Sequence, residues 1–264
     1  MKRFSIPLTV LLIAVWLLLI AYASALSPPL STTPAPRPTP RIQNTIYYTK
    51  RCWPACHYNT ALVKPAPIPV VHDFDDTLES GWAWINEDPA HWSLTEVPGT
   101  LRIVSQAGSI SDDLQDAQNV LVRDAPAGHF DTMTKVAFSP ASDSQNATIF
   151  VQMDDGRLIS LSRGYCQEGN DPSCVGSGVY FDGSDLGCAR VGVSTSSEVV
   201  HMMLRKAGNS YIGYLLSEGD WVQVGRCFDA TVTPISIGLT ATSGESGAPE
   251  IPAGFDSFTL VERP

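Results

Sequence analysis

The chain has 264 residues, a net charge of −10 and six cysteines. This acidic balance argues against nucleic acid as a partner, because phosphate groups repel an acidic surface. All 27 acidic residues lie in residues 71–264, which carry a net charge of −17, whereas the charges in residues 1–70 are all basic. Carboxylates are oxygen ligands of the kind that Ca²⁺ prefers, so we expect either no cofactor or a structural Ca²⁺.

Residues 1–25 have the pattern of a secretory signal peptide. Lys2 and Arg3 form a basic start, residues 6–20 are apolar, and Ala23-Ser24-Ala25 fits a small-residue cleavage site. The apolar run is also long enough for an uncleaved membrane anchor. In either case we expect the rest of the protein to be secreted, or held outside the membrane by its N-terminus.

Residues 26–70 combine a linker with a small cysteine-containing segment. The proline density of residues 27–41 favours an extended, semi-rigid spacer. Cys52 and Cys56 lie in "CWPACH", which is one residue too long for a haem c attachment motif and has no pocket for haem. An even cysteine count in an exported protein predicts disulfides, so we pair these two first. The other four cysteines are expected to staple loops of one region, and they are Cys166, Cys174, Cys188 and Cys227.

From Val71 onward, short apolar runs alternate with Gly, Asp, Asn, Ser and Pro. They predict strands at residues 100–105, 119–123, 132–138, 147–153, 157–163, 178–182, 199–206, 211–216, 221–226, 235–241 and 257–262. The sequences "KAGNSY" and "SEGDW" predict hairpin turns, with Gly and Asn supplying positive φ. About eleven strands without a long amphipathic helix predict that residues 71–264 form one all-β, antiparallel, two-sheet jelly-roll sandwich.

The same region resembles a known module. The blocks "FDDTLESGWAWINEDPAHWSLTEVPGTLRI", "NVLVRDAPAGHFDTMTKVAF", "WVQVG", "IGLTA" and "FDSFTLVE" occur in the order found in the concanavalin A-like β-sandwich at the C-terminus of secreted bacterial β-xylosidases and arabinofuranosidases. The module also occurs alone, as a family of unknown function. The resemblance covers about residues 72–262, and the insertion from Cys166 to Cys188 departs from it.

The resemblance implies a fold more strongly than a function. In the xylosidases the catalytic carboxylates lie in a separate β-propeller, for which this chain has no room. The paired acids nearest to a jelly-roll glucanase pattern are Asp73 with Asp75 and Glu218 with Asp220, and they are expected in turns or at strand ends. We therefore expect a secreted or surface-tethered, non-catalytic carbohydrate-binding module whose partner is an extracellular polysaccharide or glycan. The alternatives are a jelly-roll glycoside hydrolase or lyase, and a structural or adhesive extracellular domain with a protein partner.

The resemblance implies that a glycan would lie on the concave sheet or its rim loops. Gln152 and Asp154 share a face of one expected strand, and Arg163 and Tyr165 share a face of the next. Tyr180 follows the cysteine-rich insertion. If these faces meet, they form a polar cleft with two tyrosines. The alternative is a solvated face on which Arg163 pairs with an acid.

Trp82 and Trp84 are two residues apart and share a face if they lie on a strand. Flat aromatic rings can stack on sugars, so the pair is a second candidate platform. The alternative is that they seal the core, with residues 87–89 forming the turn and Trp92 packing on the return.

A Ca²⁺ site is conceivable where the domain begins and ends. Terminal strands often run side by side in such sandwiches, which would bring Asp73 near Asp256. The alternative is that both are ordinary strand-end acids. No two histidines have metal-ligand spacing.

Overall fold

The computed structural model describes residues 51–52, 56–57, 69–110, 114–167, 171–244 and 247–264. The expected signal peptide and Pro-rich spacer lie outside these ranges. Among the described residues, no helix has the length and apolar character needed to cross a membrane. The chain divides into two units, Met1–Lys64 and Pro65–Pro264.

The first unit contains two short strands. β1 (Arg51–Cys52) and β2 (Cys56–His57) pair antiparallel, with the backbone of Cys52 opposite that of Cys56. The disulfide between these two residues stays a prediction.

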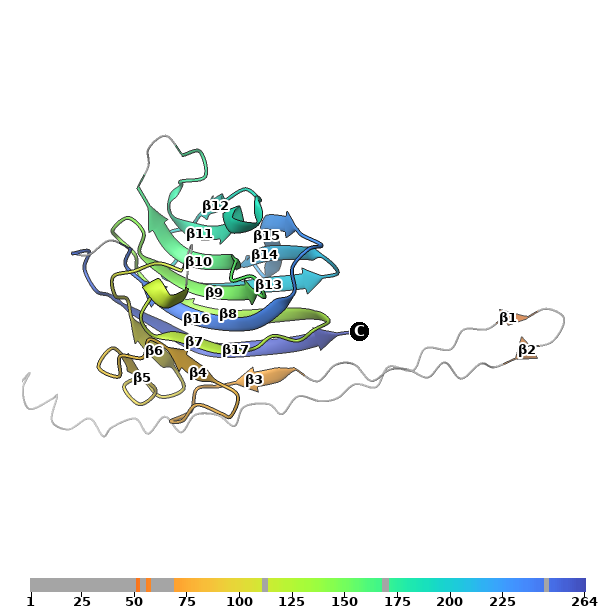
Figure 1. Ribbon diagram of the computed structural model, residues 1–264, viewed down its shortest axis with the longest axis horizontal. Coiled ribbons are helices and arrows are strands. Elements are labelled where there is room, and N and C mark those ends of the chain that lie inside the picture. Colours follow the sequence, from red (N-terminus) through yellow and green to blue (C-terminus); the bar gives the residue numbers. More distant parts are fainter. Residues whose placement is uncertain (1–50, 53–55, 58–68, 111–113, 168–170, 245–246) are drawn as a thin grey trace, which may run out of the picture. The chain divides into compact units, whose positions relative to one another are not determined.

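The second unit consists of two antiparallel sheets, whose strands are shown in Figure 1. The seven-stranded sheet has the order β12 (Val191–Ser194), β11 (Gly176–Asp182), β10 (Leu158–Cys166), β9 (Asn146–Met153), β16 (Pro234–Thr242), β7 (Val120–Asp124) and β4 (Ala83–Ile85). The eight-stranded sheet has the order β15 (Asp220–Phe228), β14 (Ser210–Ser217), β13 (Val199–Ala207), β8 (His129–Ala137), β17 (Pro252–Arg263), β6 (Leu101–Val104) and β5 (Trp92–Ser93), and β3 (Val70–His72) also pairs with β17.

The main core lies between the two sheets. Alternate residues of a strand point to opposite faces, so each strand contributes every second side chain to this core. In β9, for example, Ala147, Ile149, Val151 and Met153 are buried within it. Burial of these apolar rows is the main source of stability for the sandwich.

A second, smaller core covers part of the outer face of the seven-stranded sheet. Phe150 and Leu158 point outward from β9 and β10, yet both are buried. They pack with residues of the segment between β6 and β7, which contains the 3₁₀ turn η1 (Leu114–Asp116). This segment therefore leaves only part of the outer face open to solvent.

The predicted architecture is confirmed. Each of the eleven expected strands exists, and the described residues contain two 3₁₀ turns but no α-helix. Both hairpin turns are also present, although their positive φ angles belong to Gly208, Glu218 and Gly219 rather than to Asn209. The prediction that four cysteines staple loops is confirmed too, since Cys166 bonds to Cys174 and Cys188 to Cys227.

Candidate functional site

A shallow depression of about 90 Å³ lies on the open part of the outer face, over β9, β10 and β11. Strand register brings its residues together. Ser162 lies opposite Thr148 on one side and Tyr180 on the other, and Ser160 lies opposite Asp182. Because these residues alternate with core residues, all five side chains belong to the outer face.

Hydroxyl groups form the floor of the depression. The side chains of Thr148 and Ser162 are buried, and their oxygen atoms are 2.8 Å apart, which is hydrogen-bond distance. Ser160 lines the same surface one pleat away. A hydroxyl both donates and accepts hydrogen bonds, so this floor can pair with either kind of group on a ligand.

An acidic turn borders the floor where β11 ends. Asp182 Oδ1 accepts hydrogen bonds from the backbone N–H of Ser184 at 2.9 Å and from its hydroxyl at 2.6 Å. The 3₁₀ turn η2 (Ser184–Leu186) follows, and Asp185 accepts from the Leu158 N–H at 3.3 Å. Both carboxylates line the depression and are fixed by local hydrogen bonds.

The adjacent part of the border, on the same strand, is built around Tyr180. Its hydroxyl donates to the Gly176 carbonyl at 2.5 Å and accepts from the Val175 N–H at 3.2 Å. Burial raises the pKa of this phenol. The ring crosses β12 at Gly192, where a Cβ atom would lie 2.7 Å from a ring carbon. Only glycine therefore lets the ring lie this close to the strand.

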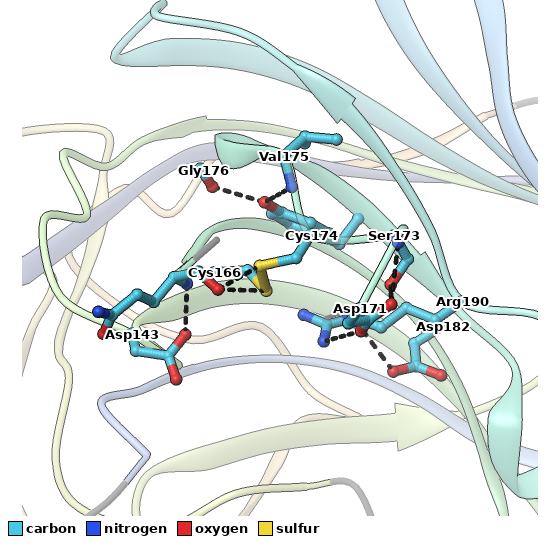
Figure 2. Close-up of a disulfide and its surroundings, with 11 residues drawn as sticks. Asp143, Cys166, Asp171, Ser173, Cys174, Val175, Gly176, Asp182 and Arg190 are labelled. Carbon is cyan, nitrogen blue, oxygen red and sulfur yellow. Dashed lines mark hydrogen bonds and ion pairs between the residues drawn. A yellow bond between two sulfur atoms is a disulfide. The ribbon is translucent and has the colours of Figure 1, made fainter. Parts of the chain in front are cut away.

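Arg190 stands over the Tyr180 ring, with its guanidinium carbon 5.0 Å from the ring centroid. Figure 2 shows the guanidinium between two carboxylates. Its nitrogen atoms lie 3.8 Å from Asp182 and 3.9 Å from Asp171. These separations allow electrostatic attraction but exceed hydrogen-bond distance. The charge of Arg190 is thus balanced while its N–H groups stay available.

A disulfide loop holds Asp171 in place. Cys166 and Cys174 bridge the connection between β10 and β11, with their Cα atoms 5.4 Å apart (Figure 2). Asp171 Oδ1 accepts hydrogen bonds from the Ser173 backbone and hydroxyl at 2.8 and 2.7 Å. The hydrogen bonds from Ser173 and the nearby Arg190 lower the pKa of Asp171.

Two predicted residues, Gln152 and Asp154, lie near the other end of these strands. Gln152 has the same outward parity as Tyr180 and accepts a hydrogen bond from Ser236 at 3.0 Å. Asp154 is exposed and accepts from the Thr233 N–H at 3.1 Å. Tyr180 thus lines the depression, and Gln152 shares its face of the sheet.

The structure does not bring Arg163 and Tyr165 onto that face. β11 pairs with β10 so that Ser162 lies opposite Tyr180, and these two side chains point to the outer face. Arg163 and Tyr165 are an odd number of residues from Ser162, so they point to the other face of the sheet. The expected cleft with two tyrosines therefore does not form from these faces. Arg163 is instead buried and donates to the backbone carbonyls of Gly164, Gly178 and Ser197, each at 3.1 Å, and to the Ser177 hydroxyl at 2.7 Å.

Apart from Tyr180, the residues that form the floor and border were not predicted from the sequence. Ser160 and Ser162 alternate with Ile and Leu in β10, which is the pattern of a polar outer face. Arg190 has no comparable signal, because it lies in a loop whose path depends on the disulfides.

A segment with three tryptophans, Trp82, Trp84 and Trp92, lies at the start of the sandwich domain. Trp82 packs edge-on against Phe258 at a centroid distance of 4.9 Å. Trp84 and Trp92 pack together at 4.8 Å. All three indoles are partly buried against the main core. Glycan stacking on Trp82 or Trp84 stays a prediction.

The polar residues of this block form a hydrogen-bonded network. The Asp88 carboxylate lies 2.6 Å from His91 Nδ1 and accepts from Gln106 at 3.0 Å, and the Asp88 backbone N–H donates to Asn119 Oδ1 at 2.7 Å. The hydrogen bond from Gln106, followed by those from Ala90 and His91, lowers the pKa of Asp88. Through Gln106 and Asn119, the network joins the start of the domain to the segment between β6 and β7, which forms part of the second core.

The expected Ca²⁺ pair has a different environment. Asp256 forms an ion pair with Lys135 at 2.7 Å. The described residues contain no group of three or more His, Cys, Asp or Glu side chains that could hold a metal ion. Binding of Ca²⁺ by Asp73 and Asp256 stays a prediction, with Lys135 as a competing partner for the second carboxylate.

Comparison with known proteins identifies the sandwich. The family model described as "Beta xylosidase C-terminal Concanavalin A-like domain" matches residues 71–260. A curated relative, the non-reducing end alpha-L-arabinofuranosidase BoGH43B of Bacteroides ovatus, is 38% identical over 96 residues, which are 35% of this chain and 18% of that protein.

Solved structures show the same fold. The GH43 protein BlXynB of Bacillus licheniformis matches with a TM-score of 0.61 and 24% identity, over 73% of this chain and 39% of that chain. The basic winged bean lectin, crystallised with Tn-antigen, matches with a TM-score of 0.53 and 9% identity, over 74% and 98%. The chain thus spans well under half the length of the two GH43 proteins. On the match over residues 71–260, the chain belongs to the family of concanavalin A-like domains found at the C-terminus of β-xylosidases.

Proposed function

We propose that this protein is a secreted or surface-tethered, non-catalytic carbohydrate-binding module, and that the depression over β9, β10 and β11 is its glycan site. The observation that carries the proposal is a hydroxyl floor, with Ser160 and Ser162, bordered by the Asp182 carboxylate and the Arg190 guanidinium. Sugar hydroxyls donate and accept hydrogen bonds, so they complement such a mixture of groups.

Family membership supports a carbohydrate ligand. The family is described as a domain of β-xylosidases, and the B. ovatus relative is named an arabinofuranosidase that acts at non-reducing ends. Xylo- and arabino-oligosaccharides are therefore the first ligands to test. The depression is small beside the ~300–1,000 Å³ of a typical ligand pocket. It would thus contact one face or one end of a glycan.

The other predicted residues fit this proposal unequally. Gln152 would extend the site along β9, because it shares the outer face. Arg163 would support the site from the opposite face, through its bonds to Gly164 and Gly178 in β10 and β11. The edge formed by Trp82 and Trp84 is the alternative location, should the depression not bind.

Export is supported by the cysteine chemistry. Two disulfides in the sandwich favour an oxidising compartment. The signal-like residues 1–25 would direct export, and the Pro-rich segment would act as a spacer between the sandwich and an N-terminal anchor.

The proposal is tested by calorimetric titration of the exported protein with xylotetraose, arabinotetraose and cellotetraose. We expect Ser160→Ala and Arg190→Ala each to weaken binding of the best ligand about five- to tenfold, as expected for loss of one hydrogen bond. Ser217→Ala, an exposed serine of β14, is the matched control and should bind like the wild type.

Each outcome bears on a different part of the proposal. Failure of all three glycans to bind would overturn the carbohydrate function. Binding that survives both site variants would move the site to the tryptophan edge. Release of reducing sugar from the same glycans would replace a binding module by an enzyme.

A further inference from the structure

We propose that the depression selects neutral glycans over acidic ones, and that Arg190 is the residue that sets this preference. The inference rests on the proposed function and specifies its ligand class. An arginine in a sugar site is usually an anchor for carboxylate or phosphate. Here its surroundings assign it a different role.

The charge of Arg190 is already balanced. Asp182 and Asp171 flank the guanidinium at 3.8 and 3.9 Å, and a further carboxylate, Asp185, lines the depression. A uronic acid placed here would meet the carboxylates of Asp182 and Asp185, and a guanidinium that Asp171 also flanks. Because like charges in close proximity repel, such a ligand is penalised relative to its neutral counterpart. The surplus of acidic residues in the whole chain acts in the same direction.

The guanidinium still has donors to offer. Among the described residues, no hydrogen bond is made by Arg190, since both ion-pair distances are too long for one. Arginine carries five N–H donors in a planar arrangement. A sugar hydroxyl can accept from them without displacing either carboxylate, and it brings no charge that must be desolvated.

Arg190 is also held in position. The Tyr180 ring lies beneath it at 5.0 Å, and that ring is fixed because its hydroxyl donates to the Gly176 carbonyl and accepts from the Val175 N–H. The Cys166–Cys174 disulfide closes the loop that carries Asp171 (Figure 2). A donor fixed before the ligand arrives loses less conformational entropy on binding.

The hydroxyl floor favours the same ligands. Thr148 is 1% exposed and Ser162 is 7% exposed, and their hydroxyls share a hydrogen bond, so a ligand group that contacts this floor meets a neutral, poorly hydrated surface. A neutral hydroxyl recovers its hydrogen bonds there. A carboxylate would exchange full hydration for neutral hydroxyls and for a guanidinium whose charge Asp171 and Asp182 already balance, which is unfavourable.

The experiment compares neutral and acidic glycans of one backbone, using the exported full chain and calorimetric titration. The probes are cellotetraose, its C6-oxidised form, in which each glucose unit has become a glucuronate, and the methyl ester of that form. We expect the oxidised form to bind at least about tenfold more weakly than cellotetraose, and methyl esterification to restore most of the loss.

Variants identify the source of the preference. Asp171→Asn and Asp182→Asn should each shift the ratio of acidic to neutral affinity by at least about threefold toward the acidic ligand, because each removes one of the carboxylates near Arg190 that repel an acidic ligand. Asp220→Asn, which removes an exposed carboxylate at the start of β15, should leave the ratio unchanged. Raising the salt concentration should narrow the gap in the wild type.

The results separate this inference from the proposed function. Equal affinity for cellotetraose and its oxidised form, or a ratio that the two variants do not move, would overturn the neutral preference while glycan binding stands. If the oxidised form alone binds, Arg190 is an acid anchor and the inference is wrong. If neither the neutral tetraoses nor the oxidised form binds, the glycan function itself fails.

Discussion

His72 is buried between groups of opposite charge. The Arg123 guanidinium donates to Nε2, and Nδ1 lies 2.6 Å from Glu79 Oε2. This arrangement suits a neutral ring that accepts at one nitrogen and donates at the other. Burial, followed by the charge of Arg123, lowers the pKa of His72 below its ordinary value, although Glu79 and Asp73 act in the opposite sense.

The lowered pKa predicts acid sensitivity. The unfolded chain takes up a proton at His72 below about pH 6.5, where the folded protein resists protonation. The free energy of unfolding should therefore fall as the pH drops below that value. His72→Gln keeps a donor and an acceptor without a titrating ring, so urea unfolding of this variant should lose less stability between pH 7.5 and pH 5.5 than the wild type. Equal losses in the two proteins would show that His72 is not responsible.

Gly192 offers a second prediction at this scale. A Cβ atom there would lie 2.5 Å from the Ser173 carbonyl oxygen and 2.7 Å from the Tyr180 ring. We expect Gly192→Ala to cost about 1–3 kcal/mol of stability, as overpacking does, and to weaken glycan binding. In Gly128→Ala the added atom meets nothing within 4 Å, so this control should change stability by less than about 0.5 kcal/mol. Similar thermal unfolding of both variants would contradict the tight packing of Tyr180.

Single residues of the site were only partly predictable. The sequence placed Gln152, Arg163 and Tyr180 around one cleft only on the condition that their faces meet; Gln152 and Tyr180 share the outer face, whereas Arg163 is buried. A charged side chain in a strand normally indicates an exposed face, whereas Arg163 finds three backbone carbonyls at the end of the sandwich. Its parity depends on the register between β10 and β11, which a sequence alone does not specify.

At the scale of elements, the two disulfides constrain loops of different length. Cys166 and Cys174 are 8 residues apart, and Cys188 and Cys227 are 39 residues apart. Chain entropy predicts that the longer loop gives the larger stabilisation, about 4 kcal/mol against about 2.5 kcal/mol. The shorter disulfide lies beside the site and the longer one joins the two sheets.

These positions predict different losses for the two Cys→Ser double variants. Replacing Cys188 and Cys227 should lower the unfolding midpoint more, while glycan affinity in the folded protein changes little. Replacing Cys166 and Cys174 should lower the midpoint less and weaken binding more, because the loop that carries Asp171 loses its closure. Chemical denaturation and calorimetric titration of both variants test this; a reversed order of stability would contradict the entropic argument.

The elements themselves were largely predictable. In long strands such as β9 and β13, apolar residues recur at every second position, as in Val200, Met202 and Leu204 of β13, which indicates a strand with a buried face. The short strands β3 and β12 were not predicted. β12 has four residues including Gly192, and it exists because β11 offers it a pairing edge. Such strands depend on tertiary pairing rather than on local pattern.

At the scale of the whole molecule, the six cysteines predict a fully oxidised protein. Four are disulfide-bonded in the sandwich, and Cys52 lies opposite Cys56 in the backbone register of the first unit. Thiol titration of the exported protein under denaturing conditions, without reductant, should find no free thiol. Two free thiols that map to Cys52 and Cys56 would show that the N-terminal pair is not bonded.

The disulfide between Cys188 and Cys227 has a consequence for how the sandwich opens. β12 is an edge strand of the seven-stranded sheet and β15 is an edge strand of the eight-stranded sheet, and the two strands contact each other. The disulfide links Cys188, in the loop that precedes β12, to Cys227 in β15. The other edges end in β4 and β5, which are only three and two residues long. Partial unfolding should therefore begin at the edges formed by β4 and β5, while the edges joined by the Cys188–Cys227 disulfide stay together. Native-state hydrogen exchange should show amides of β4 and β5 exchanging through low-energy openings, while those of β11 and β14 exchange only on global unfolding.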